Sequence, residues 1–539
     1  MYWTLGSGPP QTRPMNTKSW LVGISLGITA CATQDAHQGH GGHGPGGRLG
    51  KVDFPVECNA AAQREFNLAM AYYHSFAWVQ IQAPLERVLE ADPGCGMAHW
   101  ARALASLDNP FAWPGIISPA ALAQGPEMLE RARSTGLKSQ RERDYVDALG
   151  AFFRDPGTQN HRTRAKALET ALEQLMQRYP RDAEAATLYA LVLSANFDPA
   201  DRQYTSQLKA AAILGPIFKT QPQHPGVAHY LIHSYDYPPI AKHGLDAARR
   251  YSRIAPDAAH ALHMPSHIFT RVGAWQESIE SNRESARVAR EAAQGANAAR
   301  GLHDVLHAMD YTVYAYLQLG QYQEARAVID EMNQVKGFNP AIRTGPYALA
   351  ASTARYPVER NDWRAAAELE LRPTRFAYVD ALTHFARALG AARSGKPQAA
   401  RADVGSLAGL RDKLRAAKDA YWAEQVEIQW LAASAWVLHD EGKHEEALDA
   451  MRRAADAEDR TEKSVVTPGP LAPARELYGA MLLERAMAKD ALAAFEATLA
   501  KEPNRYNALA GAAKAAELLG DGAKAKTYSE RLPRRGAAS

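Results

Sequence analysis

A short turn sequence that recurs along the chain constrains its fold more than any other feature. In each copy, a residue suited to a left-handed backbone stands two positions before a residue that opens the next helix. The copies begin at Gly273, Gly320, Asn361, Gly395, Gly442 and Gly520, at separations of 47, 41, 34, 47 and 78 residues. This spacing predicts a series of helix hairpins. The last interval spans two hairpins, and the turn between them lacks the glycine.

The residues between the turns favour helices and exclude other classes of protein. From about residue 58 the apolar residues follow helical spacing, with many alanines and no sustained alternation typical of strands. The 62 Lys and Arg residues nearly balance the 59 Asp and Glu residues, and the net charge of +3 argues against a nucleic-acid partner. Three cysteines exclude a disulfide-rich scaffold and a thiolate-rich metal cluster, but allow one bridge.

The C-terminal part carries a complete repeat pattern. Its small, aromatic and proline positions are Leu477, Gly479, Leu482, Ala491, Phe495 and Pro503. This segment resembles the tetratricopeptide repeat family, and the turns extend the resemblance over most of the chain. The resemblance implies an all-α fold: a right-handed superhelical solenoid of tetratricopeptide-like hairpins, whose first helices line a concave face. Residues 109–160 match worst, and we expect a loop at 109–114.

Prolines mark the expected helix ends, because proline cannot continue a helix. They follow Asp92, Tyr179, Gln221, Ala255 and Glu502. We expect four segments: upstream residues and a signal peptide at 1–30, a flexible Gly/His-rich tether at 31–51, an N-terminal repeat array at 52–335 and a C-terminal array at 336–535. The tether contains His37, His40 and His43, which either bind a metal loosely or serve only as a solvated spacer.

The predicted signal peptide begins at Met15 and includes Lys18 and an apolar run too short to span a bilayer. It ends in Ile-Thr-Ala-Cys, which resembles the bacterial lipobox and implies cleavage before Cys31 and lipidation of that cysteine. The alternative is an ordinary signal peptide cut near Ala30 or Ala32. We therefore predict a periplasm-facing lipoprotein of the bacterial envelope, in the outer membrane because residue 32 is alanine. Its only membrane contact is the lipid anchor.

Cys58 and Cys95 occupy equivalent places, each just before the first helix of a hairpin. In the repeat architecture such helices lie side by side, so we expect a disulfide between these cysteines in an oxidising compartment. Two buried free thiols are the alternative.

Histidines concentrate in one region: nine of the 18 lie between residues 224 and 310. Seven of them have helical spacing, namely His229, His233, His260, His263, His267, His303 and His307. Hairpin alignment places His229 and His233 at the same two repeat positions as His263 and His267 one unit later. Residues three or four apart share a helix face, so we expect the rings to converge between neighbouring helices. Pro265 is expected to kink or break the helix between His260 and His267.

Clustered neutral imidazoles suit a transition metal, zinc or copper, with Asp236 and Asp310 as carboxylate ligands or as partners of ring nitrogens. Zinc protease chemistry is not supported, because Tyr230 stands where a zincin helix has glutamate. Two alternatives stay open. One is a hydrogen-bonded structural seam of buried histidines, and the other is a metal-free acid/base or anion pocket that includes Arg271.

Two functions follow from these patterns. The first is a scaffold that holds a protein or peptide in its concave groove, with local specificity from the histidine-rich groove at 225–315. The second is a metalloprotein in which that region holds a metal for catalysis or for a small ligand. The sequence identifies no reaction, and whether the protein is an enzyme is left open.

Overall fold

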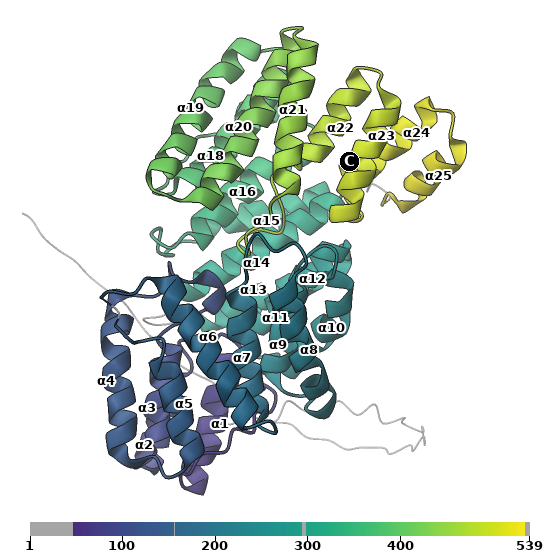
Figure 1. Ribbon diagram of the computed structural model, residues 1–539. Coiled ribbons are helices and arrows are strands. Elements are labelled where there is room, and N and C mark those ends of the chain that lie inside the picture. Colours follow the sequence, from purple (N-terminus) through teal and green to yellow (C-terminus); the bar gives the residue numbers. More distant parts are fainter. Residues whose placement is uncertain (1–46, 156, 294–297, 534–539) are drawn as a thin grey trace, which may run out of the picture. The chain divides into compact units, whose positions relative to one another are not determined.

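The computed structural model describes residues 47–155, 157–293 and 298–533, and no strand occurs within these ranges (Figure 1). The described residues all belong to one compact unit. The predicted signal peptide, the lipidation site Cys31 and the three tether histidines lie outside the described residues. None of the described helices is long and apolar enough to cross a membrane.

The first helices are α1 (Ala60–His74), α2 (Gln82–Ala91), α3 (Gly96–Ala105), η1 (Pro110–Ala112), α4 (Pro119–Gly136), α5 (Gln140–Gly150), α6 (His161–Arg178), α7 (Ala183–Ala195), α8 (Thr205–Thr220) and α9 (Pro225–Tyr235). Next come η2 (Ala241–Gly244), α10 (Leu245–Ile254), α11 (Ala259–His263), α12 (Pro265–Val272), α13 (Trp275–Ala292), α14 (Ala298–Gln318), α15 (Tyr322–Gln334), α16 (Thr344–Glu359) and α17 (Trp363–Ala367). The last are α18 (Ala377–Arg393), α19 (Pro397–Ala416), α20 (Ala420–Asp440), α21 (His444–Asp459), α22 (Ala474–Glu484), α23 (Ala488–Lys501), α24 (Tyr506–Leu518) and α25 (Gly522–Arg531).

The helices pack as repeated hairpins. Consecutive helices contact each other, as in the pairs α18/α19, α20/α21 and α22/α23 (Figure 1). The first helices α14, α16, α18, α20, α22 and α24 also contact one another in succession. First helices that lie side by side, each covered by its hairpin partner, are the arrangement of a tetratricopeptide-like solenoid. The all-α repeat fold expected from the sequence is therefore confirmed.

The turns between hairpins have the backbone that the sequence predicts. The five turn glycines have φ between +68° and +81°, and Asn361 has φ +56°. The expected turn without glycine places Ala486 at φ +57°. The five residues before the prolines named above are all C-caps, of α2, α6, α8, α10 and α23. Local backbone preference thus sets where each hairpin begins and ends.

The predicted helix break at Pro265 is present. Helix α11 ends at His263 and α12 begins at Pro265, with Met264 capping both. Proline lacks the N–H that would continue the α11 ladder, so the axis changes there and His267 lies on a different helix from His263.

Hairpins far apart in sequence meet near this break. Gly273 has φ +69°, and a Cβ there would lie 2.3 Å from the main-chain oxygen of Pro503, so only glycine fits. The Trp275 indole N–H donates to the main-chain oxygen of Asn504 at 3.0 Å. The segment 460–473, between α21 and α22, passes through the same region. Its Lys463 ammonium contacts Asp236, and the main-chain oxygen of Thr467 accepts a hydrogen bond from Tyr311.

The first hairpins are joined covalently. The Sγ atoms of Cys58 and Cys95 form a disulfide that closes a separation of 37 residues. Cys95 is the N-cap of α3, and Cys58 stands just before α1. The bond links the starts of two first helices.

Candidate metal centre

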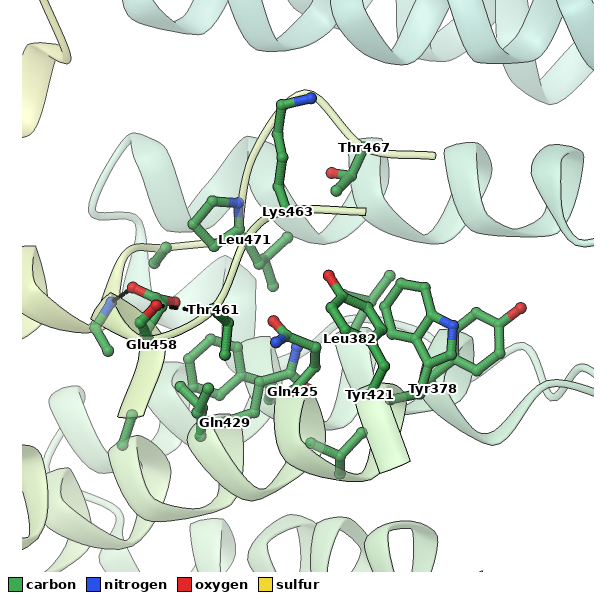
Figure 2. A pocket seen from close by; sticks show the side chains of 18 of the residues that line it. Tyr378, Leu382, Tyr421, Gln425, Gln429, Glu458, Thr461, Lys463, Thr467 and Leu471 are labelled. Atoms are coloured by element: carbon green, nitrogen blue, oxygen red, sulfur yellow. Dashed lines mark hydrogen bonds between the residues drawn. The ribbon is translucent and has the colours of Figure 1, made fainter. Parts of the chain in front are cut away.

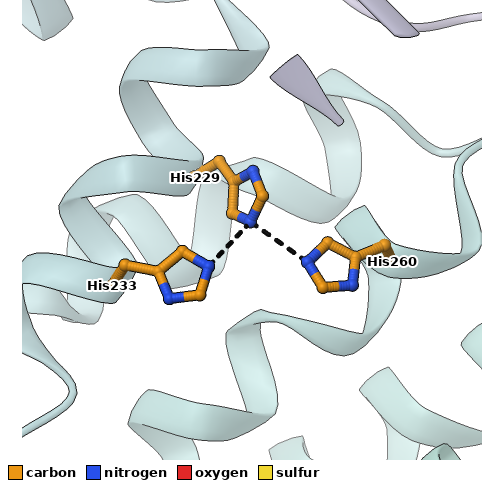
Figure 3. A group of neighbouring side chains, drawn as sticks. All are labelled: His229, His233 and His260. Carbon is orange, nitrogen blue, oxygen red and sulfur yellow. Dashed lines mark hydrogen bonds between the residues drawn. The ribbon is translucent and has the colours of Figure 1, made fainter. Parts of the chain in front are cut away.

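Three histidine rings converge between α9 and α11. Nε2 of His229 lies 3.1 Å from Nε2 of His233 and 3.2 Å from Nε2 of His260 (Figure 3). His229 and His233 share a face of α9 because they are four residues apart, and His260 faces them from α11. We call these three residues trio A. Their ligand atoms all lie within 4.8 Å of one another.

The end of α1 orients the central ring of trio A. Nδ1 of His229 lies 2.7 Å from the main-chain oxygen of His74. A carbonyl oxygen only accepts, so Nδ1 carries the proton and Nε2 keeps a free lone pair. Gly226 permits this approach, since a Cβ there would lie 2.4 Å from Nδ1 of His74.

Aromatic rings hold the imidazoles of trio A in place. Phe111 stacks on His233 at a centroid distance of 3.8 Å, and Tyr251 stacks on His229 at 5.2 Å. Phe76 stacks on His260 at 5.2 Å. Phe111 lies on η1, within the expected loop at 109–114, so the part of the chain that matches the repeat pattern worst contributes directly to the site.

A second group, trio B, lies beside the first. It contains His263 of α11, His267 of α12 and His307 of α14, whose ligand atoms also lie within 4.8 Å of one another. Nε2 of His263 and Nε2 of His267 are 3.0 Å apart. The ring centroids of His263 and His307 are 4.5 Å apart.

Two polar side chains fix the rings of trio B. Nδ1 of His263 lies 2.7 Å from Oδ1 of Asn282, whose amide nitrogen donates to the main-chain oxygen of Ser278. Nδ1 of His267 lies 2.8 Å from Oδ2 of Asp236. Both partners are acceptors, so both Nδ1 atoms carry protons, and the two facing Nε2 atoms carry lone pairs.

Burial keeps the six rings neutral. It is the main cause that lowers the pKa of His229, His233, His260, His263 and His307 well below the usual value, and neighbouring imidazoles lower these pKa values further. Burial also lowers the pKa of His267, although the Asp236 carboxylate opposes it. Four rings are buried, while His260 and His307 are partly exposed. Neutral rings have lone pairs available for a metal.

The other predicted site residues lie outside both trios. Asp236 contacts no Nε2 atom of the trios. It orients His267 through Nδ1 and accepts from Nε of Arg271 at 2.8 Å. Asp310 accepts hydrogen bonds from the Arg355 guanidinium at 2.7 Å and from the Ser352 hydroxyl. This carboxylate is therefore already paired with a buried, positively charged side chain. His303 accepts the main-chain N–H of Gly345 at Nδ1. The structure thus brings six of the seven predicted histidines together. Asp236 has the second of its two expected roles, as the partner of a ring nitrogen, whereas Asp310 is paired with Arg355 instead.

A third group supports trio A. Glu184 contacts Nε2 of His74 at 3.0 Å and Nε2 of His224 at 2.9 Å, and Tyr230 Oη lies 2.9 Å from Nδ1 of His74. Burial raises the pKa of Glu184, but the two histidines outweigh it and hold that pKa well below the usual value. The ring nitrogens of His74 are therefore engaged, and this group holds α1 against α7 and α9.

A cavity of about 60 Å³ lies on the C-terminal hairpins next to this region. Figure 2 shows the loop with Lys463, Thr467 and Leu471 passing over the helix that carries Gln425 and Gln429. Among the described residues, Nε2 of Gln425 and Oε1 of Gln429 have no hydrogen-bond partner. Arg271, which binds Asp236, also lines this cavity. The cavity therefore borders the residues that surround trio B.

Sequence reasoning missed several residues of the site. They are Glu184, Asn282, Phe111, Lys463 and Thr467. Each comes from a helix or loop that the repeat spacing does not relate to the histidines, so no periodic signal indicated them. His74 is buried, and its main-chain oxygen reaches the site.

No protein-family model matches the sequence, and no curated protein matches it. Among solved structures, the chain is similar to an IFIT1 monomeric mutant with Gppp-AAAA, at a TM-score of 0.34 and 12% identity, over 82% of this chain and 90% of that one. It is also similar to Naa15/Naa10 bound to HypK-THB, at a TM-score of 0.23 and 13% identity, over 87% of this chain and 75% of that one. A circular tandem repeat protein matches at a TM-score of 0.15 and 13% identity, covering 88% of this chain and 95% of its own. At these TM-scores the similarities support no functional argument.

Proposed function

We propose that this protein is an exported helical-repeat metalloprotein that binds two transition-metal ions, one in each histidine trio. The proposal rests on one observation in trio B: the Nε2 lone pairs of His263 and His267 face each other. Both Nδ1 protons of His263 and His267 are committed to acceptors, yet their Nε2 atoms are 3.0 Å apart. Two neutral acceptors at this distance repel each other, whereas a cation between them binds both.

Trio A supports the same conclusion. The single Nε2 lone pair of His229 faces two other Nε2 atoms, and one lone pair cannot accept two good hydrogen bonds. A structural seam would pair each buried donor with its own acceptor. A metal ion where the three Nε2 atoms meet would instead accept a lone pair from each ring.

Three imidazoles leave a fourth position for solvent or a ligand, as in catalytic rather than structural sites. Neutral ring nitrogens suit zinc and copper. Asp236 fits the expected role of a carboxylate that orients a metal ligand. It binds the second ring nitrogen of His267, as outer partners of metal-binding histidines do.

Metal analysis of protein purified without a histidine tag tests the proposal. The histidines of the tether, His37, His40 and His43, are first replaced by alanine so that loose binding there does not contribute. We expect two ions per chain. One is lost in His233→Ala, and both are lost in the His233→Ala/His267→Ala variant. His243→Ala, which changes an exposed histidine outside the trios, is the matched control.

Two results would overturn the proposal. One is a double variant that keeps both ions while remaining folded by circular dichroism. The other is a parent protein that binds neither zinc nor copper. In the second case, a sharp fall in melting temperature in His267→Ala would support the structural seam.

The export part of the proposal rests on the lipobox-like residues before Cys31 and is supported by the Cys58–Cys95 disulfide, which suits an oxidising compartment. We propose a lipid-anchored, periplasm-facing location in the outer membrane. Membrane fractionation of Cys31→Ser tests it: the parent protein should be found with outer membranes, and the variant should be soluble in the periplasm or remain unprocessed. A parent protein found in the cytosol would contradict the location.

The array is also a helical-repeat scaffold of the kind that binds proteins or ligands. A specific observation favours ligand binding at the 60 Å³ cavity, because the unpaired amides of Gln425 and Gln429 need partners. We propose this cavity, rather than the histidine region, as the place where a peptide side chain or small molecule binds. A screen of peptides and small polar molecules by thermal shift tests it. A compound that stabilises the parent should fail to stabilise Gln425→Leu/Gln429→Leu, and equal stabilisation of both proteins would refute the assignment.

A further inference from the structure

The two trios lie close enough to act as one unit. The ring centroids of His233 and His267 are 6.5 Å apart, and those of His260 and His263 are 6.3 Å apart. Within trio A the corresponding distance from His229 to His233 is 4.8 Å. Rings of different trios are thus neighbours, although they lie farther apart than rings within one trio. Two ions, one in each trio, would therefore be close to each other, as the ions of two-metal sites are.

The charge around the trios limits which ions fit. Among the residues that the structure describes, neither trio includes a carboxylate ligand. Asp236 is the carboxylate bound to a trio ring, and it is already shared with Arg271 at 2.8 Å and Lys463 at 3.5 Å. Two divalent ions would bring four positive charges into a largely buried site without compensation, which is costly. Monovalent ions halve this charge, and copper is the first-row metal that combines a stable monovalent state with a preference for imidazole.

We infer that the two trios form a dinuclear copper centre that binds dioxygen between its ions. This inference rests on the metal binding proposed above and adds the identity of the metal and of the ligand. Each Cu(I) gives one electron to dioxygen, and the resulting two-electron-reduced dianion binds both Cu(II) ions without uptake of a proton. The total charge of the centre is +2 before and after this step. Departure of dioxygen returns one electron to each ion.

The surroundings suit a small apolar ligand. Phe111 and Phe76 cover two rings of trio A, and Tyr311, which is fully buried, packs against His263 and His267. Tyr311 is itself held by a 3.0 Å hydrogen bond from its hydroxyl to the main-chain oxygen of Thr467. These rings exclude bulk water, which would otherwise compete for the open positions of the two ions.

Dioxygen uptake by the copper-loaded full chain tests the inference, again with the three tether histidines replaced by alanine. The protein is loaded anaerobically with Cu(I), freed of unbound copper and exposed to oxygen. We expect two coppers per chain, one dioxygen consumed per two coppers and a new charge-transfer absorption that disappears when oxygen is removed. The oxidised ions should be magnetically coupled, so the electron paramagnetic resonance signal should account for almost none of the copper. X-ray absorption of the same sample should show copper–copper scattering.

A variant that keeps only trio A separates the magnetic coupling of two copper ions from the binding of copper itself. His263→Ala/His267→Ala should bind one copper, take up no dioxygen reversibly and give the full resonance signal of one Cu(II) after oxidation, while His243→Ala should behave as the parent. Two coppers with the full signal of two isolated ions, or two zinc ions with no affinity for Cu(I), would overturn the dinuclear copper centre but leave the proposed metal binding intact. No metal in the parent would overturn both.

Discussion

The main-chain oxygen of His74 accepts a 2.7 Å hydrogen bond from Nδ1 of His229. His74 is the last residue of α1, and its ring is held by Glu184 and Tyr230. Through this contact, the position of α1 helps to fix the orientation of the His229 ring, the central ring of trio A. Because the acceptor is a main-chain atom, only residues that position α1 can alter it.

Glu184→Gln should weaken metal binding by trio A. The amide has one acceptor oxygen where the carboxylate has two, so it cannot accept from both His74 and His224. We expect roughly a tenfold loss of affinity, the lower end for outer partners of metal ligands. Competition with a chelator measures it, in a background that lacks His263 and His267. Glu173→Gln, a carboxylate paired with Lys209 at the surface, should leave affinity unchanged. Unchanged affinity in a folded Glu184→Gln protein would contradict the coupling.

Asp236→Asn should weaken trio B instead. The amide oxygen still accepts from His267, but the negative charge that offsets Arg271 and Lys463 is lost. We expect affinity to fall about 10- to 100-fold at trio B. The chelator assay, in a His233→Ala background, gives the value, and Glu277→Gln on the surface is the control. An equal loss at trio A, measured for Asp236→Asn in a background that lacks His263 and His267, would indicate general unfolding.

Arg505→Met should destabilise the fold. Arg505 is fully buried and donates to Glu359 and Glu476 and to the Tyr314 hydroxyl, so its loss leaves two buried carboxylates without their positive partner. We expect a loss of about 3 to 5 kcal/mol in the free energy of unfolding, measured by urea denaturation. Arg326→Met, which breaks an exposed pair with Asp330, should cost less than about 1 kcal/mol. Similar costs in the two variants would show that the buried network contributes little.

Replacing both disulfide cysteines by serine should lower the stability of the first hairpins. The bridge closes a separation of 37 residues, which corresponds to about 3 to 4 kcal/mol in the chain-entropy model. The unfolding midpoint of the parent should fall to that of the variant when a reductant is added. A variant that responds to reductant as strongly as the parent does would contradict this prediction.

Glu458→Gln should change how stability depends on pH. Burial raises the pKa of Glu458 from 4.5 to about 7, with Glu502 and Asp459 adding to the rise and Lys501 opposing it. Between these values the folded state holds a proton that the unfolded state has lost, so this group makes stability fall as pH rises and adds nothing further above about pH 7. The glutamine variant lacks this fall. Its stability relative to the parent should therefore increase from pH 5 to pH 8 and then stay level, as followed by urea denaturation. Glu445→Gln, at an exposed position of the same helix, should show no such trend.

Much of the fold could be predicted because it is set by local backbone preference. Glycines with positive φ and prolines after helix ends fix each hairpin, and Ala486 takes the left-handed backbone where the expected turn lacks glycine. The approach of distant hairpins, such as Gly273 to Pro503, could not be predicted. It depends on how small rotations accumulate over many repeats, and no local pattern encodes that sum.

The same distinction applies to the site. Spacing along α9, across Pro265 and along α14 placed six histidines on converging faces, because helical periodicity decides which side chains share a face. The same spacing also added His303 and Asp310 to the predicted site. Both lie on the same helix as His307 but have other partners. The partners Glu184 and Asn282 act through one or two hydrogen bonds between separate segments, and such isolated contacts leave no repeat in the sequence.

Helix α11 has only five residues, yet it supplies His260 to one trio and His263 to the other. Helix α13 holds it in place, because Ser281 and Ser285 donate to the main-chain oxygens of Leu262 and Ala259. One short helix therefore sets the spacing between the two trios, and a substitution that displaces it should disturb both sites together.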